Sequence, residues 1–211
     1  LNNWAYATKL PTSDWHGGSN SIVRRIELRL VDGKPVLVSQ PVDAFDQLEG
    51  YAEVRSNILV TDTGKTTLPQ PKSDAYRLRV KLDAASEANE VRFRLKEKDG
   101  HFAVVGYNFK DKTVFITRDT DAIAGLMPEV YRETRKVSAP ARDGVVSFDI
   151  IVDTISIEVF VNGGELVLSN LVFGSPGANG LSVESFGGAT ELRTFQLSPL
   201  KVVPIKRYGG D

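Results

Sequence analysis

Runs of Val, Ile, Leu and Phe alternate with polar residues along this chain, and Gly, Pro, Asn and Asp separate the runs at short intervals. This pattern is typical of an all-β protein, and long segments of helical periodicity are missing. The clearest example runs from Ile155 to Val161, where every second residue is apolar and the polar Ser156 and Glu158 lie between. Because successive side chains of a strand point to opposite faces, this segment predicts a strand with one buried and one polar face.

Similar segments recur before and after this one. The other predicted strands are Ile22–Leu30, Val36–Ser39, Tyr76–Leu82, Glu90–Glu97, His101–Phe109, Val114–Arg118, Ser147–Val152, Glu165–Phe173, Leu181–Phe186 and Thr190–Leu197. Between two of them, Asn162-Gly163-Gly164 supplies the residues with positive φ that a tight hairpin requires. Turn signals about every ten residues indicate two antiparallel sheets packed face to face. The sequence therefore predicts an antiparallel β-sandwich of two sheets, of the concanavalin-like jelly-roll type.

The chain divides into three parts by this pattern. Residues 46–200 make up the predicted sandwich. Residues 1–45 hold both tryptophans and two or three strands, which are too few to bury their own faces, so this part needs a neighbour. Residues 201–211, with Pro204, a basic pair and two final glycines before Asp211, are predicted to be a tail or linker.

Composition excludes several classes of function. The 211 residues carry 26 Lys and Arg against 27 Asp and Glu, so the formal net charge of −1 gives no field that would attract nucleic acid or an anionic membrane. No apolar run approaches the length that crosses a bilayer. Cysteine is absent, which excludes disulfides, cysteine nucleophiles and thiolate metal sites. We therefore expect neither nucleic acid nor a membrane as a partner. Because the chain starts at Leu1 without a leader, we also expect it to be a piece of a longer protein.

Short motifs that suggest ligand chemistry have simpler interpretations. Gly64-Lys65-Thr66 resembles the end of a phosphate-binding loop, but Leu59 stands where that motif needs a glycine. Asp119 and Asp121 are spaced like the start of a calcium loop, but the third oxygen ligand and the terminal Glu are missing. A surface turn and solvated turn carboxylates explain them better.

The two histidines, His16 and His101, are 85 positions apart, and neither belongs to a motif that would name its partners. A histidine in a loop or at a strand edge is the simpler interpretation of each. Taken together, these observations predict no metal and no cofactor.

Several segments resemble one known family of enzymes. At the N-terminal end these are Asn2–Ala7 (Asn-Asn-Trp-Ala-Tyr-Ala), Pro11-Thr12, Trp15, the strand Ile22–Leu30 and the exit Gln40-Pro41-Val42. Together they are similar to the last propeller blade of glycoside hydrolase family 32, the β-fructosidases, which include invertases, levanases, inulinases and fructosyltransferases. The resemblance identifies residues 1–45 as the remnant of the last blade of a five-bladed propeller.

The rest of the chain resembles the C-terminal β-sandwich of the same family. Val105-Gly106-Tyr107 is similar to a Val-Gly-Tyr strand, and Asp153–Asn162 is similar to the family pattern Asp-Arg-Ser-Ser-Val-Glu-Val-Phe-x-Asn. Thr154 and Ile155 replace the Arg and the first Ser of that pattern, which indicates a divergent branch. The resemblance implies an N-terminal catalytic propeller as the partner of this chain and, for the parent enzyme, a secreted, extracellular bacterial protein.

The catalytic motifs of the family do not occur in this sequence. They are a nucleophilic Asp in Trp-x-Asn-Asp-Pro, an acid Glu next to Cys, and an Asp in Arg-Asp-Pro. Retaining glycoside cleavage needs two carboxyl groups about 5 Å apart, and the resemblance places both of them before Leu1. We therefore expect that this chain alone is not an enzyme and that its parent is a glycoside hydrolase.

Three functions remain open at this point. The chain is a structural C-terminal sandwich that covers and stabilises the catalytic propeller, a stand-alone module that binds levan or inulin, or part of an active β-fructosidase that hydrolyses or transfers fructosyl groups. The first two are compatible with each other.

For sugar binding, an analogy with carbohydrate-binding module family 66 suggests four residues. Glu158 and Asp153 are the candidate acceptors, Tyr107 the stacking group and Arg118 the donor. The simpler interpretation of Glu158 is an outward, solvated carboxylate. The tryptophans Trp4 and Trp15 are likewise candidates either for stacking on sugar or for packing within the blade remnant.

Overall fold

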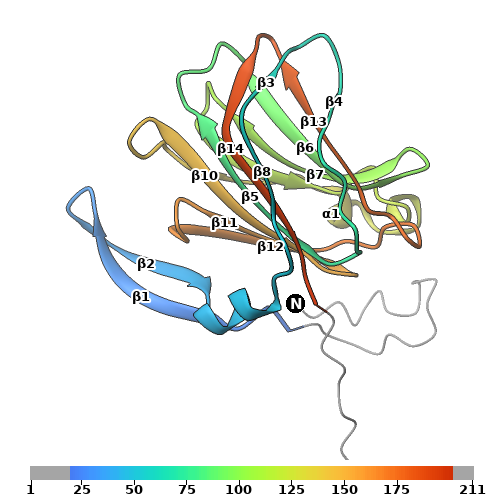
Figure 1. The fold of residues 1–211 in the computed structure, drawn as a ribbon, viewed down its shortest axis with the longest axis horizontal. Coiled ribbons are helices and arrows are strands. Elements are labelled where there is room, and N and C mark those ends of the chain that lie inside the picture. Colours follow the sequence, from blue (N-terminus) through green and yellow to red (C-terminus); the bar gives the residue numbers. More distant parts are fainter. Residues whose placement is uncertain (1–19, 202–211) are drawn as a thin grey trace, which may run out of the picture.

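The structure, a computed structural model, describes residues 20–201. Most of this range forms a sandwich of two antiparallel sheets with six strands each (Figure 1). The first sheet consists, in spatial order, of β12 (Leu166–Leu171), β11 (Ser156–Val161), β10 (Val145–Val152), β5 (Tyr76–Asp83), β14 (Thr190–Pro199) and β3 (Glu53–Val60). The second consists of β4 (Thr66–Thr67), β13 (Gly180–Phe186), β6 (Glu90–Lys98), β7 (His101–Asn108), β8 (Thr113–Thr117) and β9 (Arg135–Ser138). The all-β, two-sheet fold class is therefore confirmed. Trp4, Trp15 and His16 lie outside the described residues, as does the chain beyond Lys201.

The core lies between the inner faces of the two sheets. Strands β10 and β11 supply every second residue to it, and Ile157, Val159 and Val161 are fully buried, as their spacing predicts. Larger side chains from both sheets fill the centre, among them Tyr76 and Phe93, which are also fully buried. The turn between β11 and β12 has φ values of 50° at Asn162 and more than that at the two glycines that follow, as a tight hairpin requires.

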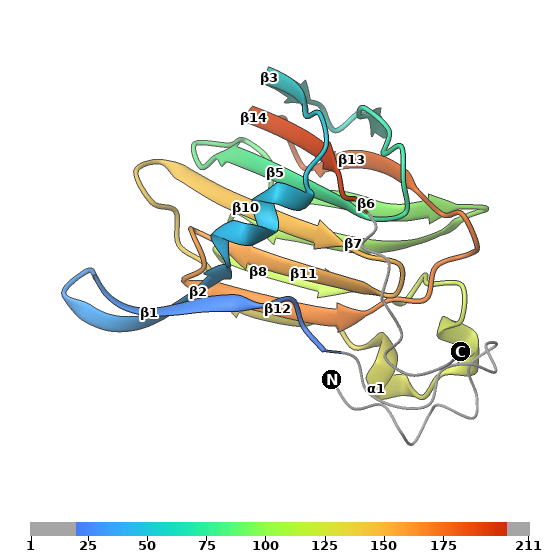
Figure 2. The same ribbon diagram turned by 60° about the horizontal axis from the view of Figure 1, so that its bottom comes forward.

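A separate two-stranded sheet precedes the sandwich. Within residues 20–201, strands β1 (Arg24–Val31) and β2 (Lys34–Pro41) pair only with each other, and they lie beside β11 and β12 (Figures 1 and 2). The chain then forms the 3-10 helix η2 (Asp43–Leu48), which crosses the outer face of the first sheet over β10 and β5 before it enters β3 (Figure 2). The outer face of the first sheet is thus partly covered by the N-terminal part of the chain.

Three strands and the short helices were not predicted. β3 is an edge strand with polar or charged residues at half of its positions, and Asn57 interrupts it with a φ of 53°. The other two strands, β4 and β9, are edge strands as well, and they are short. The helices η3 (Ala124–Leu126) and α1 (Glu129–Arg132) belong to the connection between β8 and β9. Edge strands have one unpaired side and little apolar surface to bury, so the alternation that reveals central strands is weak in them.

No helix among residues 20–201 is long and apolar enough to span a membrane.

Gly106 on β7 allows an aromatic ring to lie against the backbone of the second sheet. It pairs with Phe115 of β8, and a Cβ atom added at Gly106 would lie 2.2 Å from the tip of the Phe115 ring. The ring is 8% exposed although it lies on the outer face of the sheet. A side chain at position 106 would therefore displace Phe115.

This contact predicts a specific coupling between two substitutions. Gly106→Ala should lower the free energy of unfolding by about 1–3 kcal/mol, because the methyl group overlaps the ring. In a Phe115→Ala background the same change should cost little, since the ring is gone. Urea unfolding of the four proteins of the cycle measures the coupling, and Gly125→Ala, where nothing lies within 4 Å, is the control. Equal costs in both backgrounds would contradict the contact.

Candidate functional site

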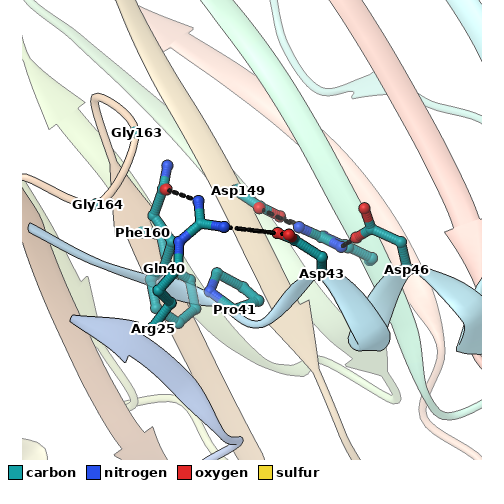
Figure 3. Close-up of a pocket in the computed structure, with 10 residues that line it drawn as sticks. Arg25, Gln40, Pro41, Asp43, Asp46, Asp149, Phe160, Gly163 and Gly164 are labelled. Carbon is teal, nitrogen blue, oxygen red and sulfur yellow. Dashed lines mark hydrogen bonds and ion pairs between the residues drawn. The ribbon is translucent and has the colours of Figure 1, made fainter. Parts of the chain in front are cut away.

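A network of polar contacts joins the β1–β2 hairpin and η2 to the outer face of the first sheet. A pocket of about 160 Å³ lies within it (Figure 3). At this pocket, Arg25 of β1 donates hydrogen bonds to Gln40 of β2 and to Asp43 at the start of η2, at 3.2 and 2.9 Å. We refer to this contact region, from Ile22 to Glu49 against β5, β10 and β11, as the seam.

Glu158 of β11 holds the first strand of the hairpin. Its Oε1 accepts a hydrogen bond from the backbone N–H of Ile22 at 2.8 Å, and its Oε2 forms an ion pair with Arg24. Arg24 also donates to Ser169 Oγ at 2.9 Å, and its guanidinium lies over the ring of Phe160. Glu158 is only 4% exposed, so the interpretation of this residue as a solvated carboxylate is wrong. It does point outward from the sheet, but the hairpin covers it.

The second strand of the hairpin rests on the turn between β11 and β12. The N–H of Ser39 donates to the carbonyl oxygen of Gly164 at 2.9 Å. A Cβ atom at Gly164 would lie 2.2 Å from the carbonyl oxygen of Ser39, and the φ of this glycine is +87°. Both the turn and the close approach of β2 therefore require glycine here.

Arg77 of β5 anchors η2 to the first sheet. Its guanidinium donates two hydrogen bonds to Asp149 of β10, at 2.7 and 2.6 Å, and further bonds to Asp46 and Glu49 at 2.6 and 2.8 Å. The ring of Phe45 lies 5.6 Å from the guanidinium carbon of Arg77. Arg77 itself is only 5% exposed. Burial disfavours the charged form, but the hydrogen bonds and charges of the surrounding carboxylates outweigh it and raise the pKa of Arg77.

Glu49 completes this network at the end of η2. Its carboxylate also accepts a hydrogen bond from Arg79 at 2.8 Å. Burial acts to raise the pKa of Glu49, but the hydrogen bond from Arg79 and the charges of Arg79 and Arg77 outweigh burial and lower it. A general acid needs the opposite shift, a raised pKa. The seam is therefore suited to hold two parts of the chain together by charge-assisted hydrogen bonds.

No cluster of residues that could hold a metal ion occurs within residues 20–201.

The four predicted sugar-binding residues do not form one site. Tyr107 is 2% exposed, and its hydroxyl donates to the carbonyl oxygen of Ala139 inside the core, so its position is incompatible with stacking on a sugar. Glu158 lies on the opposite side of the first sheet from that core, and its two oxygens are engaged in the seam.

Arg118 and Asp153 lie elsewhere on the fold. Arg118 donates to the carbonyl oxygens of Tyr131 and Leu171 and stacks over the Tyr131 ring, so its donors are used to hold the loop after β8. Burial lowers the pKa of Arg118. Asp153 is exposed, accepts a hydrogen bond from the N–H of Thr154 and lines a hollow beside Ile22. Of the four, Asp153 alone combines exposure with a hollow.

The arginines of the seam were not predicted, although part of the signal is present in the sequence. Arg77 and Arg79 occupy alternate positions of a predicted strand, which indicates that they share its outer face. Their partners, Asp46 and Glu49, are about 30 positions away in the sequence and lie on a helix that no periodicity indicates. The pairing therefore appears only once the chain is folded.

Comparisons with known proteins agree on one family. Residues 44–199 match the family described as glycosyl hydrolases family 32 C terminal. The chain is similar to a levanase from Bacillus subtilis (strain 168), with 26% identity over 206 residues that cover 96% of this chain and 30% of the levanase. A levanbiose-producing levanase from the same strain is 30% identical over 202 residues, which cover 92% of this chain and 37% of that protein.

A solved structure shows the same arrangement of strands. The crystal structure of an exo-inulinase from Aspergillus awamori matches with a TM-score of 0.77 at 25% identity and covers 94% of this chain and 38% of the inulinase. The chain thus spans about a third of the length of these relatives.

Removing the charge of Glu158 should loosen the hairpin. Glu158→Gln loses the ion pair with Arg24, so the amides of β1 and β2 should exchange with deuterium about tenfold faster or more, while those of β10 and β5 keep their protection. Hydrogen–deuterium exchange read by mass spectrometry measures both regions. The control is Glu53→Gln, whose carboxylate pairs only with the neighbouring Arg55 among residues 20–201. Unchanged exchange in β1 and β2 would show that the ion pair does not hold the hairpin.

The lowered pKa of Glu49 predicts the pH dependence of stability. The folded protein binds a proton at Glu49 less readily than the unfolded chain does, so this stabilisation is complete above the ordinary value of 4.5 and is lost as the pH falls through the lowered pKa. Glu49→Gln should therefore reduce the free energy of unfolding at neutral pH and flatten its decline in acid. Urea unfolding between about pH 3 and 7 tests this, with the exposed Glu87→Gln as the control. A decline as steep as that of the unmodified chain would contradict it.

Proposed function

Because the chain belongs to glycoside hydrolase family 32, as the C-terminal part that the family match over residues 44–199 identifies, we propose that it is the non-catalytic β-sandwich of a fructan-acting hydrolase. In this proposal residues 46–200 are the sandwich, and the hairpin belongs to residues 1–45, the remnant of the last propeller blade. The sandwich stabilises the N-terminal catalytic part of the same enzyme, and the hairpin is its point of attachment.

The observation that carries this proposal is the apolar face of the hairpin. Ile26, Leu28 and Leu30 alternate along β1, and Leu37 of β2 lies directly opposite Leu28, so these side chains share one face. They are 54%, 73%, 77% and 64% exposed, respectively. Neighbouring aliphatic side chains exposed to this extent on one hairpin are typical of a surface that another protein part covers.

The hairpin also has too few strands to be stable by itself. A two-stranded sheet is marginal in water, and β1 and β2 pair with no other strand among the described residues. Its polar contacts with the sandwich are those of the seam and an ion pair between Asp32 in its turn and Arg142, and they leave the apolar face open. Additional strands of a propeller blade would complete this sheet and bury that face. This supports a domain docked on a partner over a stand-alone carbohydrate-binding module, because an exposed apolar face on a stand-alone module would promote aggregation.

The names of the relatives support the substrate class and location. Three of the similar proteins are named levanases, and one from Aspergillus niger is named an extracellular exo-inulinase. We infer that the parent is an extracellular β-fructosidase acting on levan or inulin, and that its catalytic carboxyl groups reside in the N-terminal part. The chain alone then has no hydrolytic activity, and association with that part produces the active enzyme.

Charged substitutions on the hairpin should prevent this association. When the N-terminal catalytic part of the parent enzyme is produced separately and mixed with this chain, we expect a one-to-one complex that releases fructose from levan or inulin. Leu28→Asp with Leu37→Asp should weaken the complex about 100-fold or more, because two buried aliphatic side chains are replaced by charges. Sedimentation velocity measures the complex, and released fructose measures its activity.

The matched control is Leu59→Asp on the edge strand β3, a leucine that is 63% exposed and lies outside the hairpin. This variant should bind like the unmodified chain. A failure of the unmodified chain to associate, or fructose release by the chain alone, would refute the proposal.

A further inference from the structure

The outer face of the second sheet carries a hollow of about 360 Å³. It is lined by side chains of β6, β7, β8 and β9 and by the ends of the connection between β8 and β9. The hairpin and η2 lie on the other side of the sandwich, against the first sheet, so they do not cover it (Figure 2). Its volume lies within the range of roughly 300–1,000 Å³ that is typical of sites for small ligands.

The floor of the hollow is apolar and includes an aromatic ring. Phe115 lies flat against Gly106, and Val104 and Phe102 of β7 lie beside it among the lining residues. Phe115 and Val104 are 8% and 3% exposed, so the surrounding polar side chains rise above them. An aromatic face at the bottom of a polar hollow is suited to pack against the C–H groups of a sugar ring.

Hydrogen-bonding groups around this floor lack partners. The hydroxyl oxygen of Thr117 is buried and forms no hydrogen bond within residues 20–201. The side chains of Thr113, Asp119 and Lys136 also line the hollow, and none of them has a hydrogen-bond or ion-pair partner in that range. In the seam, by contrast, the arginines are matched by carboxylates. A buried hydroxyl without a partner is costly, and a ligand that supplies the missing bond offsets that cost.

The charges of the hollow point to a neutral ligand. Three carboxylates, from Glu90, Asp111 and Asp119, face two cations, from Arg92 and Lys136. The mixture offers both acceptors and donors at close range, whereas the excess of carboxylates opposes a phosphate or another polyanion. A neutral molecule with many hydroxyl groups satisfies donors and acceptors together.

We infer that this hollow binds a neutral oligosaccharide. The identity of the sugar rests on the proposed function, which makes the ligand a short stretch of β-fructan. Because the hollow and the hairpin lie on opposite sheets, the sandwich can hold the polymer while it is attached to the catalytic part. A polymer held at the hollow stays close to the catalytic part, so its effective concentration there is raised.

Electrophoresis of the 211-residue chain in gels that contain levan, inulin or dextran tests the inference. We expect levan or inulin to retard the chain, and dextran to leave its mobility unchanged. Asp119→Ala with Lys136→Ala should weaken the retardation at least about tenfold, since two charge-assisted hydrogen bonds are lost. The matched control is Asp62→Ala with Lys72→Ala, which removes the same two charges at exposed positions away from the hollow.

Thr117→Val separates binding from folding. Valine keeps the shape of threonine and removes a hydroxyl that has no partner within residues 20–201, so thermal stability should be unchanged or higher. Fructan affinity should fall about threefold to tenfold, because the bond to the ligand is lost. Absence of retardation by both fructans, equal retardation by dextran, or full binding by the Asp119/Lys136 double variant would overturn the inference. None of these outcomes affects the association of the hairpin with the catalytic part, so the two proposals fail independently.

Discussion

The arrangement of the N-terminal segment depends on one buried guanidinium. Arg77 lies in the centre of the first sheet and is 5% exposed, and a charge in that position is destabilising unless carboxylates surround it. Asp149 supplies one partner from the neighbouring strand, but Asp46 and Glu49 come from the segment before the sandwich. The helix η2 must therefore cross the sheet at this place. Since β2 leads directly into η2, the same requirement positions the hairpin with its aliphatic face toward solvent.

The alternation of apolar and polar residues was sufficient to predict the central strands and their buried faces. It did not predict which side chains are buried on the outer face of the first sheet. Val159 and its neighbours are buried for the reason that alternation gives, namely that every second side chain enters the core. Glu158 obeys the same rule and faces outward, yet it is buried because a segment more than 130 positions away covers it. The rule predicts which face a residue occupies, but it does not predict whether another part of the chain lies on that face. The suggestion that Tyr107 stacks on a sugar has the complementary weakness. It was made by analogy without regard to alternation, and Tyr107 lies on the inner face of its sheet.

The two outer faces of the sandwich use polar side chains differently. On the first sheet, arginines and carboxylates are matched by the chain itself, so their hydrogen-bonding capacity is used for cohesion. On the second sheet, Gly106 allows Phe115 to lie flat beneath a hollow, and donors and acceptors at its polar border have no partner in the part of the chain that the structure describes. This division would allow one small domain to attach to the proposed catalytic part on one side and to bind the proposed ligand on the other.

The division also has a mechanical consequence. The hairpin, η2 and the first sheet are joined by the ion pairs of Arg24 and Arg77, whereas no such contact joins the hairpin to the second sheet among the described residues. Separation of the proposed catalytic part would expose the hairpin and strain the seam. The strain would reach β5 and β10 directly. It would reach the second sheet through the packed core and through the connection from β9 to β10, where Arg142 pairs with Asp32 of the hairpin turn. A core of interdigitated side chains is dense and transmits strain, so the shape of the hollow responds to events at the hairpin. The proposed attachment and the proposed sugar binding are therefore expected to be energetically coupled, through the core and through the connection between β9 and β10.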